Sequence, residues 1–421
     1  MRRRAFHCLA CSSLSLALGG LALRTLYGAA RPHYGGTLRV QLLTMFPSPE
    51  ALPLVSEALV RFDEHGDLRP GLARGWQPDA EKKRWRFIIR PRTVPAARIA
   101  AALRPALKKI YPDATITPAA QSIIIQSAKP MPDLLDRLSR PNTGIPGTGP
   151  FRVSKWEPGR RAILIANDEY LGGRPFVDAV EFSVATQRAY QPGAADLWEL
   201  PAGIGRRSIP DWMHVWTSAS LDLIALELKN SVPGLRDALS LSIDRAAIVN
   251  VLLQRRGEAA SGLLPQSLTG YEFLFSAPYD PARAKEIATP ARPATLTLSV
   301  SSTDALSRAV ADRVMLNARD GNLNIQPASQ PGEGNIHLLH VRLGCEGAAR
   351  ALHEIDSDVP IPDVSTPEAL YRVERALLDE GRLIPIVHVP QVFGAGPRIH
   401  SNMGLPSCGL LDAIPNLWLA P

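Results

Sequence analysis

The sequence predicts a mixed α/β protein divided into two or three lobes. The chain has 421 residues, which is too long for one small domain, and no internal repeat is visible. Short stretches with the alternation of β-strands are interspersed with stretches that repeat apolar residues every three to four positions, as helices do. Strands and helices mixed in this way along one chain indicate α/β or α+β lobes.

Strand patterns recur through the first half of the chain. They cover residues 37–42, 60–68 with a turn at the glycine, 84–90, 122–126, 151–153, 162–165 and 180–184. One helix is expected among them, because Ile99, Leu103 and Leu107 repeat every four residues. Pro105 is the feature that argues against this helix.

Helices are more frequent in the second half. One helix is expected from about Val232 to Arg255, with Gly257 as its stop, and a second across residues 306–314. A third begins at Ser365-Thr366-Pro367-Glu368, which combines a cap, a proline in the first turn and a glutamate three residues after the serine; it ends near Gly381. Residues 384–389 then form a buried strand.

Gly147-Thr148-Gly149 raises the question of a phosphate-binding loop. Such a loop needs glycines that follow a strand and lead into a helix, so that free amides and the helix dipole face the anion. Here Pro150 removes one amide, and the next segments are two strands joined by a turn at residues 157–160. We therefore expect these glycines to bend the backbone and to allow close packing.

No motif of a known catalytic or metal chemistry is visible in the sequence. It lacks HExxH, Gly-x-Ser-x-Gly, a Walker loop and GxGxxG. His337 and His340 lie in a strand pattern, where residues three apart face opposite sides and cannot share a metal ion. Cys345 and Cys408 are open to two interpretations, one disulfide or two separate thiols. We expect no catalytic residues, no metal and no cofactor; a secreted hydrolase on an unrelated mixed fold is the alternative from another class.

The net charge of +7 is interpreted as a solvated surface. The basic clusters at residues 81–86 and 205–207 are too short for a nucleic-acid arm and have no aromatic residues interleaved for base stacking. We expect no nucleic-acid partner.

The first 30 residues have the three-part plan of a secretory signal peptide. Three arginines precede an uncharged run from Cys8 to Leu23, and Tyr27-Gly28-Ala29-Ala30 supplies small residues for cleavage. Arg3-Arg4-Ala5-Phe6 resembles a twin-arginine export signal. The run is short for a membrane span, although a retained anchor is the alternative. We expect export to the periplasm or another extracytoplasmic space.

Five stretches, taken in order, resemble the family 5 extracellular solute-binding proteins, the peptide, nickel and oligosaccharide receptors of ABC importers. The resemblance runs in order through nearly all of the chain after the leader and rests on residues 35–40, 57–91, 147–151 with 167–175, 235–265 and 278–285. The fourth, LRDALSLSIDRAAIVNVLLQRRGEAASGLLP, is similar to the family's "R.ALs.aiDR..iv" helix.

The resemblance implies a two-lobed periplasmic binding protein-like fold of the class II type, with mixed sheets and a reduced extra subdomain. Lobe 1 would cover residues 36–230, with the trimmed subdomain at about 50–143. Lobe 2 would cover 231–384, and 385–421 would return to lobe 1. Two such lobes hinge, and the ligand selects the closed state. The resemblance also implies a monomer that delivers its solute to an ABC permease and ATPase complex and meets the membrane only through the permease.

The implied ligand is an oligopeptide or a related polar solute, with an oligosaccharide or a metal chelate as the alternative within the family. The family's peptide receptors carry an aspartate that receives the peptide amino group; residues 341–347 match that segment without its Trp and Asp-Pro, so that Glu346 stands in as the anion. The implied ligand-binding residues are Trp198, Asn230, Tyr271 and Glu346. The first three have structural alternatives, as a core residue, a turn residue and a packing residue.

Overall fold

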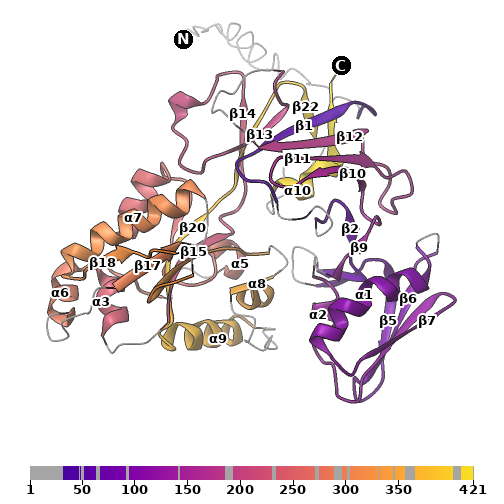
Figure 1. Cartoon of the computed structure of the whole chain (residues 1–421), viewed down its shortest axis with the longest axis horizontal. Helices are drawn as coiled ribbons and strands as arrows, with labels where there is room; N and C mark the ends of the chain where they lie inside the picture. The colour runs from indigo at the N-terminus through magenta and orange to yellow at the C-terminus, as the bar shows by residue number, and fades with distance from the viewer. Residues whose placement is uncertain are drawn as a thin grey trace, which may run out of the picture.

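The structure is a computed structural model of the chain, shown in Figure 1. It describes residues 32–46, 48, 52–62, 67–91, 94–140, 143–184, 193–229, 234–270, 275–288, 296–300, 304–330, 332–344, 347–355, 366–401 and 409–420. The expected signal segment, Cys345, Cys408 and three expected ligand-binding residues lie outside these ranges: Asn230, Tyr271 and Glu346. Within the described ranges, every helix is too short or too polar to cross a bilayer.

The first lobe is built on a seven-stranded mixed sheet, at the top of Figure 1. Its strands, in spatial order, are β10 (Phe151–Glu157), β11 (Arg161–Ala166), β12 (Ala179–Val184), β1 (Thr37–Leu42), β13 (Leu197–Leu200), β21 (Val392–Ala395) and β14 (His214–Thr217). β1 alternates as predicted, with Leu38, Val40 and Leu42 buried. The face they form is covered by α10 (Leu410–Ala413), the 3-10 turn η4 (Ile414–Asn416) and the hairpin of β22 (Ile399–Ser401) and β23 (Leu417–Leu419).

A small subdomain leaves the first lobe after β1 and returns before β10. Its core is a four-stranded sheet of β5 (Ala73–Pro78), β6 (Arg84–Ile89), β8 (Ser122–Gln126) and β7 (Thr115–Ala119). On this sheet lies α1 (Ala96–Ile110), whose buried face is the predicted one, and Pro105 is accommodated inside the helix. The remaining elements are α2 (Leu134–Arg137) and two ribbons, β2 (Ser56–Glu57) with β9 (Ile145–Pro146) and β3 (Val60–Phe62) with β4 (Leu68–Pro70).

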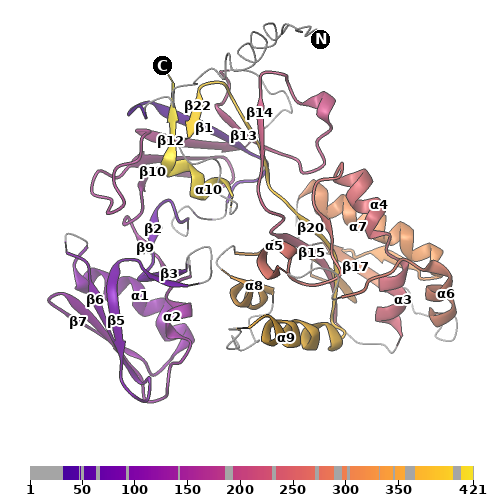
Figure 2. The ribbon, with the colours of Figure 1, turned by 180° about the vertical axis from the view of Figure 1, so that it is seen from behind.

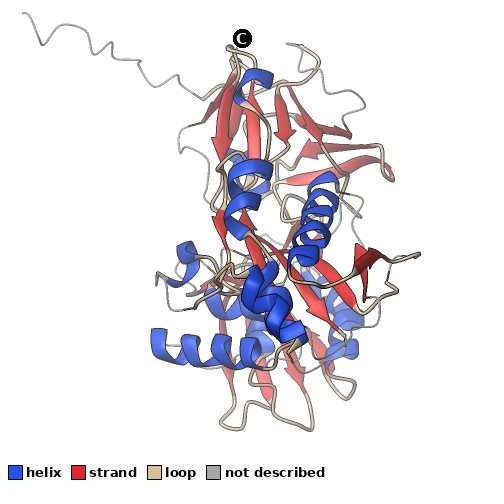
Figure 3. Ribbon diagram, turned by 90° about the vertical axis from the view of Figure 1, so that its left-hand side faces the viewer, coloured by secondary structure: helices blue, strands red, loops and turns tan. Residues whose placement is uncertain are grey.

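The second lobe has a six-stranded sheet with helices on both faces (Figures 1 and 3). Its strands, in spatial order, are β16 (Glu258–Ala259), β20 (Leu383–Val389), β15 (Asp222–Leu228), β19 (Ile336–Arg342), β17 (Leu296–Val300) and β18 (Ile325–Pro327). One face packs on α3 (Leu235–Ser242), α6 (Pro281–Ala288) and α7 (Ala305–Asp320). The other packs on α8 (Ala348–Ile355) and α9 (Pro367–Asp379), near the short α5 (Gln266–Thr269). α9 begins at the predicted Thr366 cap.

The helix expected from Val232 to Arg255 is not continuous, which corrects the sequence-based prediction. α3 ends at Ser242, because Ile243 has extended backbone angles and Asp244 starts a new turn by accepting a hydrogen bond from the Ala247 amide at 2.8 Å. The short α4 (Arg245–Ala247) runs into a π-helical turn, η3 (Ile248–Leu252). An aspartate side chain can bind nearby backbone amides, which lets it compete with helix continuation.

The Gly147-Thr148-Gly149 loop turns the chain, as the sequence predicts. The amides of Gly147 and Gly149 both donate to the carbonyl of Val55, at 2.9 and 3.0 Å, so neither is available to an anion. Gly147 has a φ of +80°, and a Cβ on Gly149 would lie 2.7 Å from the Leu54 oxygen and the Val55 carbonyl carbon. The two glycines therefore fix the junction between the small subdomain and the first lobe.

His388 lies on β20, a fully buried strand of the second lobe between β16 and β15. Its ring is 3% exposed, and Nε2 donates to the Leu263 carbonyl oxygen at 3.0 Å. Burial lowers the pKa of His388 to about 4, against the smaller opposing effect of that hydrogen bond. The folded protein therefore holds this histidine neutral.

We expect Gly149→Ala to lower the free energy of unfolding by about 1–3 kcal/mol, because the new methyl group meets backbone atoms that cannot move aside. Gly205→Ala is the matched control, since its φ is −69° and nothing lies within 4 Å of the added Cβ. Urea unfolding of both variants measures the difference. Equal stability of the two would contradict the close packing of Gly149.

We expect the protein to lose stability as the pH falls from about 6.5 toward 4, because the unfolded chain binds a proton at His388 that the folded chain excludes. The loss from this group approaches about 3 kcal/mol. His388→Gln keeps an N–H donor and does not titrate, so its unfolding free energy should fall less steeply over this range. His214→Gln, at an exposed position, should follow the wild type. Identical slopes for His388→Gln and wild type would refute the assignment.

Candidate ligand-binding site

Two crossovers join the sheets of the first and second lobes. Residues 218–221 connect β14 to β15, and residues 390–391 connect β20 to β21. The crossovers are hydrogen-bonded to each other: the Ser218 amide donates to the Gln391 carbonyl at 2.9 Å, and the Gln391 amide donates to Ser218 Oγ at 2.9 Å. Two adjacent connections between two rigid bodies have the form of a hinge.

The position of the crossovers differs from the expected lobe boundaries. β15 begins at Asp222 and pairs with β19 and β20, so the chain enters the second sheet before residue 230. β20 continues in that sheet to Val389, beyond residue 384. Strand pairing decides to which lobe a segment belongs. The predicted boundary lies too late because no strand is predicted at residues 222–228.

A second contact lies beside the hinge. Arg256, which follows η3, donates to the carbonyl oxygens of Ala202 at 3.1 Å and Ile204 at 2.5 Å in the first lobe. A Cβ on Gly203 would lie 1.9 Å from the Leu252 oxygen, so this segment needs a glycine to approach the π-helical turn. The two lobes are therefore fixed to each other on this side of the crossovers.

Charged side chains lie at the strand ends next to the hinge. Asp222 is the first residue of β15 and Arg342 is the last residue of β19, and the antiparallel register places them opposite each other. Arg342 Nη1 and Asp222 Oδ1 are 2.7 Å apart. A Cβ on Gly409 would lie 2.8 Å from Arg342 Nη2 and from Gln391 Oε1, so the Arg342 guanidinium also abuts the backbone that leads into α10 of the first lobe.

Asp304 caps α7 at the same end of the second sheet. Its carboxylate accepts hydrogen bonds from the Leu306 and Ser307 amides, and its Oδ2 lies 3.4 Å from His340 Nδ1. Ser307 Oγ is 3.0 Å from the same histidine nitrogen. Burial would raise the pKa of Asp304, but the hydrogen bonds from His340 and the α7 terminus outweigh it and hold the pKa well below its usual value.

The first lobe contributes two carboxyl groups. Glu199 on β13 accepts a hydrogen bond from the Leu43 amide at 2.9 Å, and burial raises its pKa, helped by the nearby carboxylates of Asp222 and Asp304. Asp412 on α10 is solvent-accessible, yet the surrounding protein raises its pKa against the attraction of Arg342. We call this group the interlobe charge cluster; it consists of Glu199, Asp222, Asp304, His340, Arg342 and Asp412.

The cluster can hold a polar solute that carries charge. It has four carboxyl groups and one guanidinium, and the two carboxyls of the first lobe are the ones whose ionised form is disfavoured. A cationic group placed beside Glu199 and Asp412 would favour their ionised form, which is the usual effect of an opposite charge. Arg342 carries five N–H donors and suits a ligand carboxylate or carbonyl.

Trp198 is the expected ligand-binding residue that falls within the described ranges. It lies on β13 with 1% of its surface exposed, and its ring packs against Trp212 with centroids 5.5 Å apart. Its neighbour Glu199 points to the opposite face of the sheet, toward the charge cluster. The structure thus shows Trp198 in a core under residues 201–213, and its contact with ligand stays a prediction.

His340 is the one charge-cluster residue that the sequence singled out, and only as a metal ligand that the strand pattern excludes. Asp304 before an apolar-periodic helix is a readable capping signal. The others come from separate strands and from α10, and only the sheet register brings them together.

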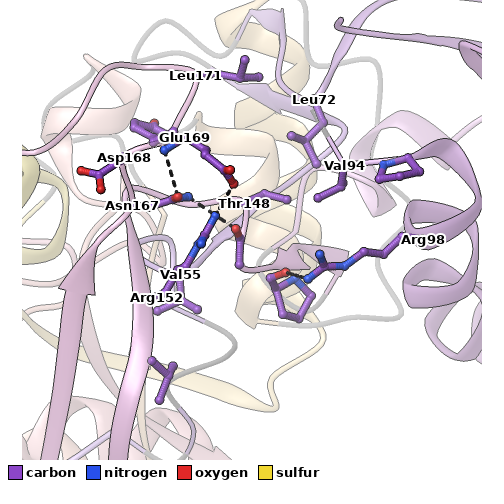
Figure 4. A pocket seen from close by; sticks show the side chains of 15 residues that line it. Val55, Leu72, Val94, Arg98, Thr148, Arg152, Asn167, Asp168, Glu169 and Leu171 are labelled. Atoms are coloured by element: carbon purple, nitrogen blue, oxygen red, sulfur yellow. Dashed lines mark hydrogen bonds and ion pairs between the residues drawn. The ribbon is translucent and has the colours of Figure 1, made fainter. Parts of the chain in front are cut away.

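A separate pocket of about 1090 Å³ lies between the small subdomain and the first lobe (Figure 4). The start of α1, the turn at residues 146–148 and the loop at residues 167–171 form its walls. Its carboxylates are already paired: Arg152 contacts Glu169 at 2.5 Å and Asp168 pairs with Arg174 at 2.7 Å. Arg98 donates to the Pro146 carbonyl. The lining carboxylates therefore offer little unmatched negative charge to a polar solute.

The chain matches the family model of the bacterial extracellular solute-binding proteins, family 5, over residues 102–331, which is more than half of its length. It is 28% identical over 138 residues to the oligopeptide-binding protein AppA of Bacillus subtilis, which covers 30% of this chain and 25% of that protein. It is 24% identical over 395 residues to the nickel-binding periplasmic protein of Escherichia coli, covering 76% and 73% of the two chains.

Solved structures share the fold at low identity. NikA from Staphylococcus aureus in complex with Ni(L-His)2 superposes with a TM-score of 0.74 at 14% identity, over 88% of this chain and 97% of that one. AppA from Bacillus subtilis in complex with a nonapeptide has a TM-score of 0.73 at 14% identity, over 93% and 100%. The predicted two-lobed fold of mixed sheets is confirmed.

The chain spans a minor part of the length of two of these relatives, 25% for AppA and 27% for the probable D,D-dipeptide-binding periplasmic protein DdpA of Escherichia coli. The match to the family model over residues 102–331 confirms the predicted resemblance. This chain belongs to the family 5 bacterial extracellular solute-binding proteins.

Proposed function

We propose that the protein is the extracytoplasmic receptor of an ABC importer and that it encloses an oligopeptide or a related polar solute between its two lobes. The observation that carries the proposal is the pairing of the crossovers at Ser218 and Gln391, with charged groups of both lobes beside it. A hinge next to a charged interlobe surface is what a receptor needs in order to close around a polar ligand.

The charge pattern supports a solute that carries an amine together with hydrogen-bond acceptors such as carbonyl or carboxylate oxygens. A peptide ammonium would lie against Glu199 and Asp412, and a peptide carbonyl or carboxylate would face Arg342. Hydrogen bonds to charged groups contribute about 1.5–3 kcal/mol each, which is enough to orient a peptide in a closed site.

The remaining parts of the proposal follow from the family. The protein acts as a monomeric binding protein without a catalytic step, reaches its compartment through the leader at residues 1–30, and delivers its solute to a permease and ATPase complex. Relatives whose names refer to oligopeptides, dipeptides and nickel support a peptide first and a metal chelate second.

We expect a peptide library to raise the melting temperature of the protein, because a ligand that binds only the folded state stabilises it. At a ligand concentration of 100 times Kd the gain is about 2.7 kcal/mol. Thermal-shift assays with peptides, oligosaccharides and nickel-histidine measure it. Peptides should give the largest shift; no shift in any of the three panels would contradict a receptor function.

We expect Glu199→Gln and Asp412→Asn each to weaken the binding of the best library peptide about tenfold, since each change removes a carboxylate and keeps the shape. Glu368→Gln, on the exposed start of α9, is the matched control and should bind as the wild type does. Titration calorimetry gives the three Kd values. If both cluster variants keep the wild-type Kd, the peptide does not lie at the interlobe charge cluster.

A further inference from the structure

The small subdomain contacts the second lobe directly, away from the hinge. α8 of the second lobe meets the segment that begins with α2 of the small subdomain (Figures 1 and 2). The contacting residues are more than 200 positions apart in the chain and belong to different sheets. A third body therefore takes part in holding the lobes together.

A buried arginine forms the first half of this contact. Arg350 on α8 is 6% exposed, and its Nη1 donates to Ser139 Oγ at 2.9 Å. Ser139 is itself oriented, because its hydroxyl donates to the Asp136 carbonyl at 2.7 Å. The Arg350 guanidinium also lies 6.0 Å from the Phe62 ring of the small subdomain. Separating the two bodies would remove both of these partners from a buried cation.

A histidine forms the second half. His353, one turn along α8 and 5% exposed, has its Nε2 3.3 Å from Nη1 of Arg137 on α2. A guanidinium has donors and no acceptor, so the histidine nitrogen in this contact must be the unprotonated one. Protonation of His353 would place an N–H donor and a positive charge against a second donor and a second positive charge.

The charges around this contact are balanced while the histidine is neutral. Among the described residues, the small subdomain supplies Asp133 paired with Arg137 at 3.0 Å and Asp136 paired with Arg140 at 2.6 Å. On α8, Glu354 lies 3.6 Å from Arg350 and is also attracted by Arg140. Tyr111 donates to Asp133 at 2.5 Å. In these contacts the facing groups are three arginines and three carboxyls, and protonation of His353 would add one more positive charge beside Arg137.

We propose that the Arg350–Ser139 and His353–Arg137 contacts form a latch between the second lobe and the small subdomain, and that the latch opens when His353 takes up a proton. The proposal rests on the proposed function in one respect, that an open latch releases the solute. Histidine is the side chain whose ordinary titration range lies between pH 5 and 8, so mild acid is the expected trigger.

Hydrogen exchange of the ligand-free protein tests the latch independently of any solute. In the wild type, the amides of residues 134–140 and 348–355, corrected for intrinsic exchange, should exchange at least tenfold faster at pH 5 than at pH 8. Small-angle scattering should show a larger radius of gyration at pH 5. In His353→Gln, whose amide oxygen still accepts from Arg137 and does not titrate, the pH dependence of both quantities should fall well below that of the wild type, which leaves the part that His388 contributes through global stability.

Two further variants complete the design. Ser139→Ala removes the acceptor of Arg350 and should speed exchange at pH 8 as well. His400→Gln, in the β22 strand of the first lobe, is the histidine control and should keep the wild-type pH response. A pH response of undiminished size in His353→Gln would overturn the role of His353. No pH response in the wild type would overturn the switch altogether, whatever the thermal-shift assays show about ligands.

Discussion

The pair of hydrogen bonds between Ser218 and Gln391 is the constraint on which the arrangement of the two lobes depends. It holds two crossovers side by side, so that β15 leaves the hinge and β20 returns to it as neighbours in one sheet. The antiparallel pairing of β15 with β19 then places Arg342 opposite Asp222 beside the hinge. A shift of β15 by one residue relative to β19 would turn Asp222 to the other face of the sheet and separate it from Arg342.

The balance of charge separates the interlobe charge cluster from the pocket between the small subdomain and the first lobe. In the pocket, the lining carboxylates of Asp168 and Glu169 each have an arginine within ion-pair distance. In the cluster, Asp222 has Arg342, whereas burial raises the pKa of Glu199 and the surrounding protein raises that of the solvent-accessible Asp412. A cationic ligand group would stabilise the ionised form of carboxyl groups whose pKa the protein raises. This is why volume alone does not identify the site.

The sequence was sufficient for those parts of the fold that depend on local patterns. The alternation of Trp85, Phe87 and Ile89 and the spacing of Ile99, Leu103 and Leu107 each predicted one buried face, and the structure buries both faces against each other. The break between α3 and α4 was not predicted. An aspartate can lie inside a helix or cap the start of a new one, and apolar periodicity does not distinguish these two roles for Asp244.

The site could not be predicted in the same way. Asp222 and Arg342 are brought together only by a long-range strand register. Glu199 belongs to the first lobe, whereas Asp222 and Asp304, whose carboxylates help to raise its pKa, belong to the second. Trp198 shows the same limit: it is adjacent to Glu199 in sequence, yet strand alternation places it on the other face of β13, against Trp212. Local patterns report which face of a strand is apolar and carry no information on which other strand lies opposite.

The hinge and the α2–α8 contact hold the lobes by different kinds of interaction. The interactions at the hinge do not depend on protonation, whereas the α2–α8 contact does. At the hinge, backbone amides and a serine hydroxyl form the bonds, and none of these groups titrates near neutral pH. Beside it, Arg256 binds two carbonyl oxygens, which keep their charge distribution at any pH. The α2–α8 contact instead joins ionisable side chains, one of which must be neutral for the contact to exist. Protonation of His353 would therefore weaken the α2–α8 contact and leave the hydrogen bonds between the crossovers intact, so that the proposed opening is a rotation about the crossovers.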